Sequence, residues 1–491
     1  MAPRRGSTRT RPLLAGGVLV AVAVLTASSA IVVPAQPSDA AASELPSLTV
    51  VENNRAAPAS VQAARSMFRS SPSAVVVSSA ASEDDLEHGI AVAERNRIPV
   101  FHIVDDTYTF PVGFALGALD VSSVIGIGAD QPDFRLPVTT SETTRPGVPS
   151  ELAQGRPLVL VADSGDVGAA NAEAAGATGV RVPVGDPRSS GAAVAALKAD
   201  PDRPIVTVGD FGAEKTVADR IAQARTVPEL PGGGQIVFPG RRMVALYGSP
   251  GGPDLGPLGA QDIPASIRRV KRVARPYGRL VDVPVVPTFE IIVTVASSDP
   301  GYRGKYTNII DPSAIRPWVD AARDAGVYVT LDLQPGRMDF LTQAKMYRDL
   351  LLEPHVGLAL DPEWRLKPRQ VHLTQIGSVD PDEVNRTADW LADLVRTEHL
   401  PQKVFVLHQF DADMLGDRSR LDTSHPELAT VIHADGHGTA SVKRATWQRI
   451  ITGLPPNVWL GWKNFYKEDR PMFSPLATFD VEPQPMFVSY Q

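Results

Sequence analysis

The chain has 491 residues, 43% of them hydrophobic and 21% charged, a composition typical of a soluble globular protein with room for two or three domains. It contains no cysteine, which excludes disulfides, thiol nucleophiles, zinc–thiolate sites and iron–sulfur clusters. The formal net charge of -7 at pH 7 argues against nucleic acid as a partner, and we expect none.

Residues 1–42 carry the pattern of an export signal. Arginines precede an uncharged apolar run from Leu13 to Val33, and the small-residue stretch Asp39–Ser43 then offers an A-x-A-like cleavage site. The pattern predicts a secreted or envelope-associated protein. The apolar run is also long enough to cross a bilayer, so an uncleaved N-terminal anchor is the alternative and would be the protein's contact with a membrane.

Residues 43–240 alternate short apolar runs with alanine-rich helical stretches. The helical spacing is clearest over Glu83–Asn96 and Val167–Ala175. Such alternation predicts parallel α/β structure, here as a duplicated, Rossmann-like unit with two sets of three strands. The expected strands are Ala74–Val77, Val100–Val104, Val124–Gly128, Leu158–Val161, Val180–Val184 and Ile205–Gly209.

Three short motifs in this region match a known repeat. Ile98-Pro99-Val100 has the apolar-Pro-apolar pattern, and Val124–Gly128 and Ile205–Gly209 have the pattern of a closing strand that ends in glycine. On these motifs the segment resembles the cell wall-binding repeat 2 family, which implies attachment to a cell wall. The glycine-rich turns at Pro231–Gly234 and Phe238–Gly240 then mark a domain boundary.

Residues 241–491 have the length and element pattern of a (β/α)8 TIM barrel. Amphipathic helices are expected over Ser313–Ala325, Phe340–Leu352, Asp380–Thr397 and Thr439–Ile451. Eight apolar runs alternate with them and predict the barrel strands: Val244–Tyr247, Phe289–Val295, Val327–Leu333, Gly357–Leu360, Val404–Leu407, Ala429–Ile432, Val458–Trp462 and Met486–Ser489.

Polar side chains follow five successive strands of this predicted barrel, at the end where such barrels place their active sites. Asp332, Asp361, Glu363 and Asp435 are the candidate catalytic carboxylates. The candidates for substrate binding are Trp364, His408, Gln409, His433, His437, Trp462 and Lys463.

Asp361 and Glu363 form the most specific pair. Their i, i+2 spacing places both carboxyls on one face, where each raises the cost of ionising the other, so that one stays protonated as a general acid. This D-x-E at the end of strand four resembles the family 25 and family 18 glycoside hydrolases, which implies Glu363 as acid, Asp361 as its partner, and a glycan substrate. The leading interpretation is an exported hydrolase of wall or extracellular glycan.

Two alternatives remain open at this stage. One is a non-catalytic protein that binds wall polysaccharide through the same mouth, which the proline between Asp361 and Glu363 favours. The other is a metal-dependent hydrolase that uses the H-x-D-x-H of His433, Asp435 and His437. The glycines beside these histidines suit a substrate-lining turn better, so the sequence predicts neither a metal nor a cofactor; it contains no phosphate-binding glycine motif.

Overall fold

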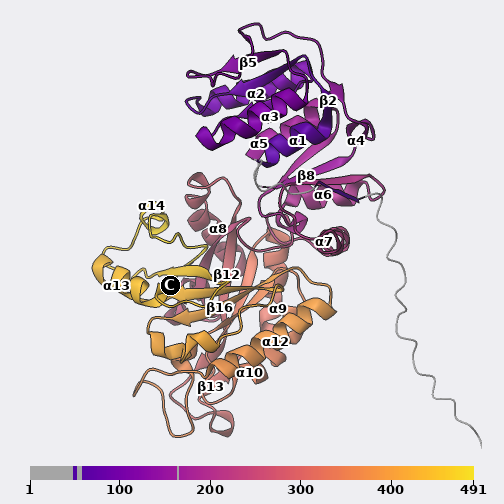
Figure 1. The fold of residues 1–491 in the computed structure, drawn as a ribbon. Helices are drawn as coiled ribbons and strands as arrows, with labels where there is room; N and C mark the ends of the chain where they lie inside the picture. The colour runs from indigo at the N-terminus through magenta and orange to yellow at the C-terminus, as the bar shows by residue number, and fades with distance from the viewer. Residues whose placement is uncertain (1–47, 52–57, 163–164) are drawn as a thin grey trace, which may run out of the picture. The chain divides into compact units, whose positions relative to one another are not determined.

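A computed structural model describes residues 48–51, 58–162 and 165–491 (Figure 1). The predicted export signal and its alternative as an anchor lie outside the described residues. Within the described part, no helix is both long and apolar enough to cross a membrane.

The region before the barrel contains two four-stranded sheets, and their main strands are parallel as predicted. The first has the order β4-β3-β5-β6 and the second the order β9-β8-β10-β1. Each expected strand is present. The strands are β1 (Leu48–Val50), β3 (Ser73–Val77), β4 (Val100–His102), β5 (Ser123–Ile127), β6 (Val138–Thr139), β8 (Leu158–Ala162), β9 (Thr178–Val182) and β10 (Ile205–Val208), and β2 (Phe68–Ser70) pairs separately with β7 (Val148–Pro149).

Helices connect these strands and are set by local signals as well as by packing. The longest, α2 (Glu83–Asn96), begins with a capping box between Ser82 and Asp85 and ends at Arg97 in the left-handed region at φ 56°. The helix α5 (Gly165–Ala174) carries the fully buried Asn171, whose amide bonds both the N–H and the carbonyl of Val100 at 2.9 Å. The other helices are α1 (Ala59–Met67), α3 (Thr109–Ala118), α4 (Glu151–Gln154), α6 (Gly191–Ala199) and α7 (Glu214–Thr226).

The second half folds into a closed barrel of eight parallel strands, as predicted. The strands run in the order β11-β19-β18-β17-β16-β15-β14-β12, and β12 closes the ring by pairing with β11. A short strand, β13 (Thr307–Ile309), extends β12 in the antiparallel sense. The barrel strands are β11 (Arg242–Gly248), β12 (Val285–Ala296), β14 (Tyr328–Leu333), β15 (Val356–Leu360), β16 (Lys403–Gln409), β17 (Leu428–Ala434), β18 (Trp459–Asn464) and β19 (Phe487–Tyr490).

The connections depart from a regular barrel in two places. The helix expected over 340–352 is divided at Tyr347, whose hydroxyl lies 2.6 Å from the carbonyl oxygen of Val293. Between β16 and β17 the chain forms only two short 3-10 turns, Ala412–Leu415 and Arg418–Arg420. The helices around the barrel are α8 (Ile263–Ala274), α9 (Pro312–Ala325), α10 (Phe340–Met346), α11 (Arg348–Leu351), α12 (Pro381–Thr397), α13 (Ala440–Ile451) and α14 (Pro475–Phe479).

Strand alternation divides the buried residues of the barrel into two apolar sets. Side chains such as Leu246 and Leu331 point outward and share one core with the surrounding helices. Their neighbours Ala245, Val406 and Val431 belong to a separate core inside the barrel. The next inward position toward the C-terminal end of each strand is polar, and this change of chemistry places the candidate site.

Candidate active site

A polar layer lies on top of the inner apolar core, at the C-terminal mouth of the barrel. Every strand contributes one residue to it, on the strand or directly after it, and each is at most 3% exposed. The members are Tyr247, Glu290, Asp332, Asp361, His408, His433, Lys463 and Ser489. Charged groups this deeply buried require partners, so their pairing decides which of them are ionised.

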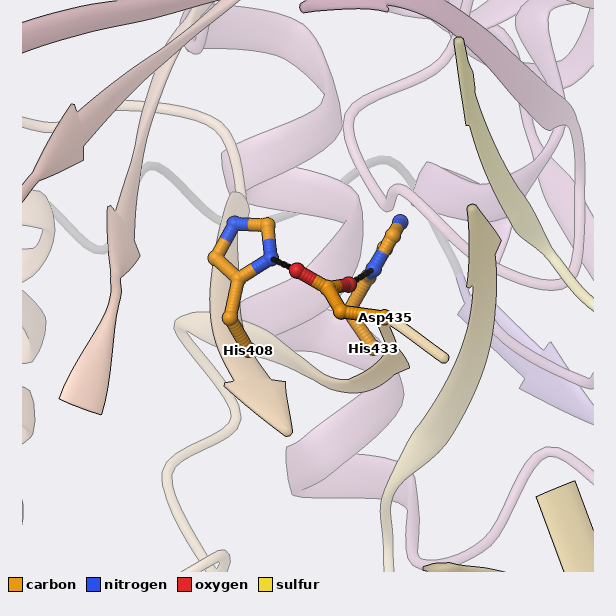
Figure 2. A group of neighbouring side chains, drawn as sticks. All are labelled: His408, His433 and Asp435. Carbon is orange, nitrogen blue, oxygen red and sulfur yellow. Dashed lines mark hydrogen bonds and ion pairs between the residues drawn. The ribbon is translucent and has the colours of Figure 1, made fainter. Parts of the chain in front are cut away.

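Asp435, just after β17, is the centre of this network (Figure 2). Its Oδ2 accepts from Nδ1 of His408 at 2.8 Å and from Nζ of Lys463 at 3.0 Å, and its Oδ1 contacts Nδ1 of His433. Burial favours the protonated carboxyl, but the charges of His408 and Lys463 outweigh it and hold the pKa of Asp435 well below its usual value. Asp435 is therefore ionised at neutral pH.

The two histidines differ in charge. Nε2 of His408 lies 3.0 Å from Oε1 of Glu290. Burial disfavours the charged imidazolium, but the negative charges of Asp435 and Glu290 outweigh burial and raise the pKa of His408 well above its usual value. Burial also opposes ionisation of Glu290, and His408 reverses this and lowers its pKa. For His433, burial is the largest influence and lowers the pKa, and Nε2 lies 3.1 Å from the Ser489 hydroxyl. Thus His408 is a cation and His433 a neutral ring.

Three other carboxyls in the same mouth have raised pKa values, in contrast to the lowered values of Asp435 and Glu290. Burial raises the pKa of Asp332 to about 6, although its Oδ2 accepts a 2.8 Å hydrogen bond from the Tyr247 hydroxyl. Burial, then the charges of Glu363 and Asp332, raises the pKa of Asp361 well above its usual value. Burial raises the pKa of Glu363 to about 7, and the largest charge acting in the same direction is Asp435. At neutral pH Asp361 therefore holds a proton that Asp435 and Glu290 lack, Glu363 is divided between its protonated and ionised forms, and Asp332 is mostly ionised.

Glu363 and Asp435 are the members of this set that reach solvent. Glu363 lies in the 3-10 turn Pro362–Trp364 and is partly exposed, and the Asp435 side chain is 12% exposed. The expected effect of Asp361 and Glu363 on each other is present in one direction. After burial, Glu363 is the leading charge that raises the pKa of Asp361, whereas Asp435 is the leading charge that acts on Glu363.

The mouth brings together seven of the sequence-predicted site residues, from five strands and the segments that follow them: Asp332, Asp361, Glu363, His408, His433, Asp435 and Lys463. Trp364 follows Glu363 and is partly exposed, with its ring 5.4 Å from that of His372.

Two predicted substrate-binding residues point away from the mouth. Gln409 is buried outside the barrel wall, where its Nε2 donates to the carbonyl of Ala412 at 2.9 Å. Trp462 is 2% exposed and packs with Trp447 and Phe473, at ring distances of 5.5 and 5.1 Å. Each is adjacent in sequence to an inward-pointing residue, His408 or Lys463, and because side chains alternate along a strand, each points to the outside of the barrel. They support the barrel rather than line it.

His437 is also separate from the polar layer. It is exposed, its ring lies 5.6 Å from that of Phe465, and it lines a different cavity of about 430 Å³ that Tyr466 also borders. The H-x-D-x-H spacing therefore does not form one set of ligands, because the chain turns away from the mouth after Asp435.

A different trio has the spacing of metal ligands. Donor atoms of His408, His433 and Asp435 lie within 4.8 Å of one another (Figure 2). However, the ammonium of Lys463 lies 3.0 Å from the same Asp435 oxygen that accepts from His408. A metal ion would have to displace the Lys463 ammonium, which the Asp435 carboxylate already binds. These residues therefore fit a metal poorly, and the ion-paired network explains why they lie together.

Sequence reasoning missed Tyr247, Glu290 and Ser489. Glu290 is the single charged residue inside the long apolar strand Val285–Ala296, and this pattern in the sequence could have identified it as a site residue. A lone carboxylate in a strand that is buried on both faces needs an internal partner, here His408.

No family model and no curated protein matches the chain. Among solved structures, a quadruple mutant of the α-N-acetylgalactosaminidase NagBb from Bifidobacterium bifidum is similar at a TM-score of 0.23 and 10% sequence identity. The match covers 48% of this chain and 44% of that chain, so it spans less than half of either. Similarity at this level establishes neither a shared fold nor a shared function.

Proposed function

We propose that the barrel is a glycoside hydrolase that cleaves wall or extracellular glycan with Glu363 as general acid and Asp435 as the ionised carboxylate. One observation carries this proposal: two carboxyls in one mouth have pKa values displaced in opposite directions, Glu363 up to about 7 and Asp435 well below its usual value. Such a division into one protonated and one ionised carboxyl is what glycosidic cleavage requires.

The reaction assigns a task to each group. Glu363 transfers its proton to the glycosidic oxygen as the bond to the anomeric carbon breaks, while Asp435 faces the positive charge that develops at that carbon. Water then supplies hydroxide to the carbon and returns a proton to Glu363. His408 and Lys463 position Asp435 and keep it ionised, and Asp361 remains neutral.

The region before the barrel supports attachment to a wall. Its two sheets share the order in which the second strand, the first and the third lie side by side, β4-β3-β5 and β9-β8-β10. This common order supports a duplicated α/β unit and, with the motifs that resemble cell wall-binding repeats, an exported protein that is held at the envelope.

Turnover tests the proposal directly. Glu363→Gln keeps the shape of the side chain but removes the transferable proton, so hydrolysis of peptidoglycan or an N-acetylhexosamine oligomer falls roughly 100-fold while binding persists. The exposed Glu468→Gln is the matched control and retains activity. A wild-type protein that binds glycan without turning over any member of a broad panel contradicts the proposal and leaves a non-catalytic binding protein.

The pKa of Glu363 provides a second readout, by carboxyl NMR titration of labelled protein. Asp435→Asn removes the largest charge that raises this pKa, so the lowering effects of Lys463 and His408 weigh more and the pKa of Glu363 falls. Asp361→Asn changes it less, because Asp361 is already protonated. A larger effect from Asp361→Asn than from Asp435→Asn contradicts the assigned charges.

A further inference from the structure

We infer that the glycan carries oxyanion groups, phosphate or carboxylate, and that a basic pocket beside the mouth binds one of them. This inference rests on the proposed function and specifies the class of its substrate. The pocket has a volume of about 480 Å³. Five of its lining residues are basic, in a chain whose formal net charge is -7: Arg303, Lys305, Arg337, Arg365 and Lys367.

The acidic residues of the pocket already have their own partners. Glu383 forms a three-contact ion pair with Arg365, at 2.9, 3.2 and 3.0 Å. Asp380 lies 3.3 Å from Arg420, which approaches from outside the pocket lining. Neither carboxylate has an ion pair with Lys305, Arg337 or Lys367.

Three basic side chains in the pocket have no acidic partner within the described residues. Lys305 and Lys367 have neither an ion pair nor a side-chain hydrogen bond there. Arg337 donates to the carbonyl of Gln370 at 2.7 Å and lies over the Tyr306 ring at 4.3 Å, both of which orient the guanidinium without neutralising it. The pocket therefore has a net positive charge, and the side chains of Lys305, Lys367 and Arg337 are available to bind an anion.

The loops that carry these charges are joined by backbone hydrogen bonds. The Arg337 N–H donates to the Lys305 carbonyl at 2.7 Å, and the Leu366 N–H donates to the Gly336 carbonyl at 2.8 Å. Three connections thus hold their basic residues at fixed separations before any ligand arrives. Such preorganisation lowers the entropic cost of binding a multivalent anion.

The same backbone segment links the pocket to the candidate acid. Glu363 precedes Arg365 by two residues, and the Glu363 carbonyl accepts from the N–H of Gly377 at 2.7 Å, next to the lining residue Ser378. A polymer that is bound with its scissile bond at Glu363 and extends toward Arg365 would bring an oxyanion on a neighbouring sugar to Lys305, Lys367 and Arg337.

Calorimetry on the full chain tests the inference without turnover, by using Glu363→Gln as the background. The probes are a neutral N-acetylglucosamine oligomer, an oligomer of the same length with alternating glucuronate, and one that carries sugar phosphate. We expect at least one anionic oligomer to bind roughly tenfold or more tightly than the neutral one, with an advantage that shrinks as salt rises. Comparison of the two anionic probes identifies the oxyanion.

Variants then assign this advantage to the pocket. Lys305→Glu with Lys367→Glu abolishes the preference, the double arginine replacement at the same positions retains it, and Lys271→Glu on the exposed face of α8 leaves it unchanged. Equal affinity for neutral and anionic oligomers, or a preference that survives charge reversal, overturns the inference even if the barrel hydrolyses neutral glycan. Conversely, a pocket-dependent preference without turnover retains the inference and rejects the hydrolase.

Discussion

The sheets before the barrel and the barrel itself are both built from buried parallel strands, but they differ in the polarity of the side chains that these strands bury. β3 and β8 are apolar or small throughout and fully buried, whereas barrel strands β12, β14 and β16 place Glu290, Asp332 and His408 at inward positions. Burial of an ionised side chain is costly unless a partner is supplied. β3 and β8 bury no charged side chain, whereas the barrel maintains a charged layer that stability alone does not require.

The largest expected effect on stability comes from removing the carboxylate at the centre of this charged layer. Asp435→Ala leaves His408 and Lys463 buried without their shared carboxylate, so the free energy of unfolding falls by about 3–5 kcal/mol. Chemical denaturation of the full chain measures this loss. Asp349→Ala on α11, whose side chain is 87% exposed, is the control and changes stability little. A loss below 1 kcal/mol for Asp435→Ala would show that the network is loosely paired.

A second experiment sharpens the comparison through pH. Burial raises the pKa of Asp332 to about 6, so the folded state keeps a proton that the unfolded state releases from about 3.8 upward. The stability from this group is complete below that range and is lost as pH rises toward 6. Asp332→Asn keeps an acceptor for the Tyr247 hydroxyl but cannot ionise. Relative to the wild type, the variant should therefore gain stability between about pH 4 and 6.

The difference between wild-type and variant unfolding free energies, followed across this pH range, isolates the contribution of Asp332 from that of other carboxyls. Asp349→Asn, at a side chain that is 87% exposed, serves as the control for the substitution itself. A flat curve for Asp332→Asn would mean that Asp332 is ionised in the folded state.

The smallest expected effect lies in the region before the barrel, where stability comes from apolar packing and local caps. Ser82→Ala removes the side-chain acceptor of the Asp85 N–H at the start of α2 and should cost about 1 kcal/mol. Thermal unfolding of the full chain, compared with Ser82→Asp, which restores a capping acceptor, measures it. A loss as large as that of Asp435→Ala would remove the distinction between the two regions.

Hydrophobic periodicity was sufficient to predict the parallel sheets and all eight barrel strands, because buried parallel strands read as continuous apolar runs bounded by turns. It did not identify α8 or α14, and the helix that it predicted over 340–352 is divided at Tyr347. The order of strands in the two sheets depends on long-range pairing, which no local pattern specifies.

For the site, the strand-end signature found the carboxylates and cations but not their orientation. Alternation from His408 and Lys463 would have assigned Gln409 and Trp462 to the outer face. The pairing of Glu290 with His408 joins residues far apart in sequence, and only closure of the barrel brings them to 3.0 Å. Charge states follow from such pairings and were beyond sequence reasoning for the same reason.

The backbone bonds that join the loops after β12, β14 and β15 also have a consequence for motion. The N–H groups of Arg337 and Leu366 each donate to a carbonyl of another loop, and the Gly377 N–H donates to the Glu363 carbonyl within the connection after β15. Loop amides of this kind exchange with solvent only when the partner segment also opens. This side of the mouth should therefore behave as one cooperative unit with slow amide exchange, rather than as three independently fluctuating loops.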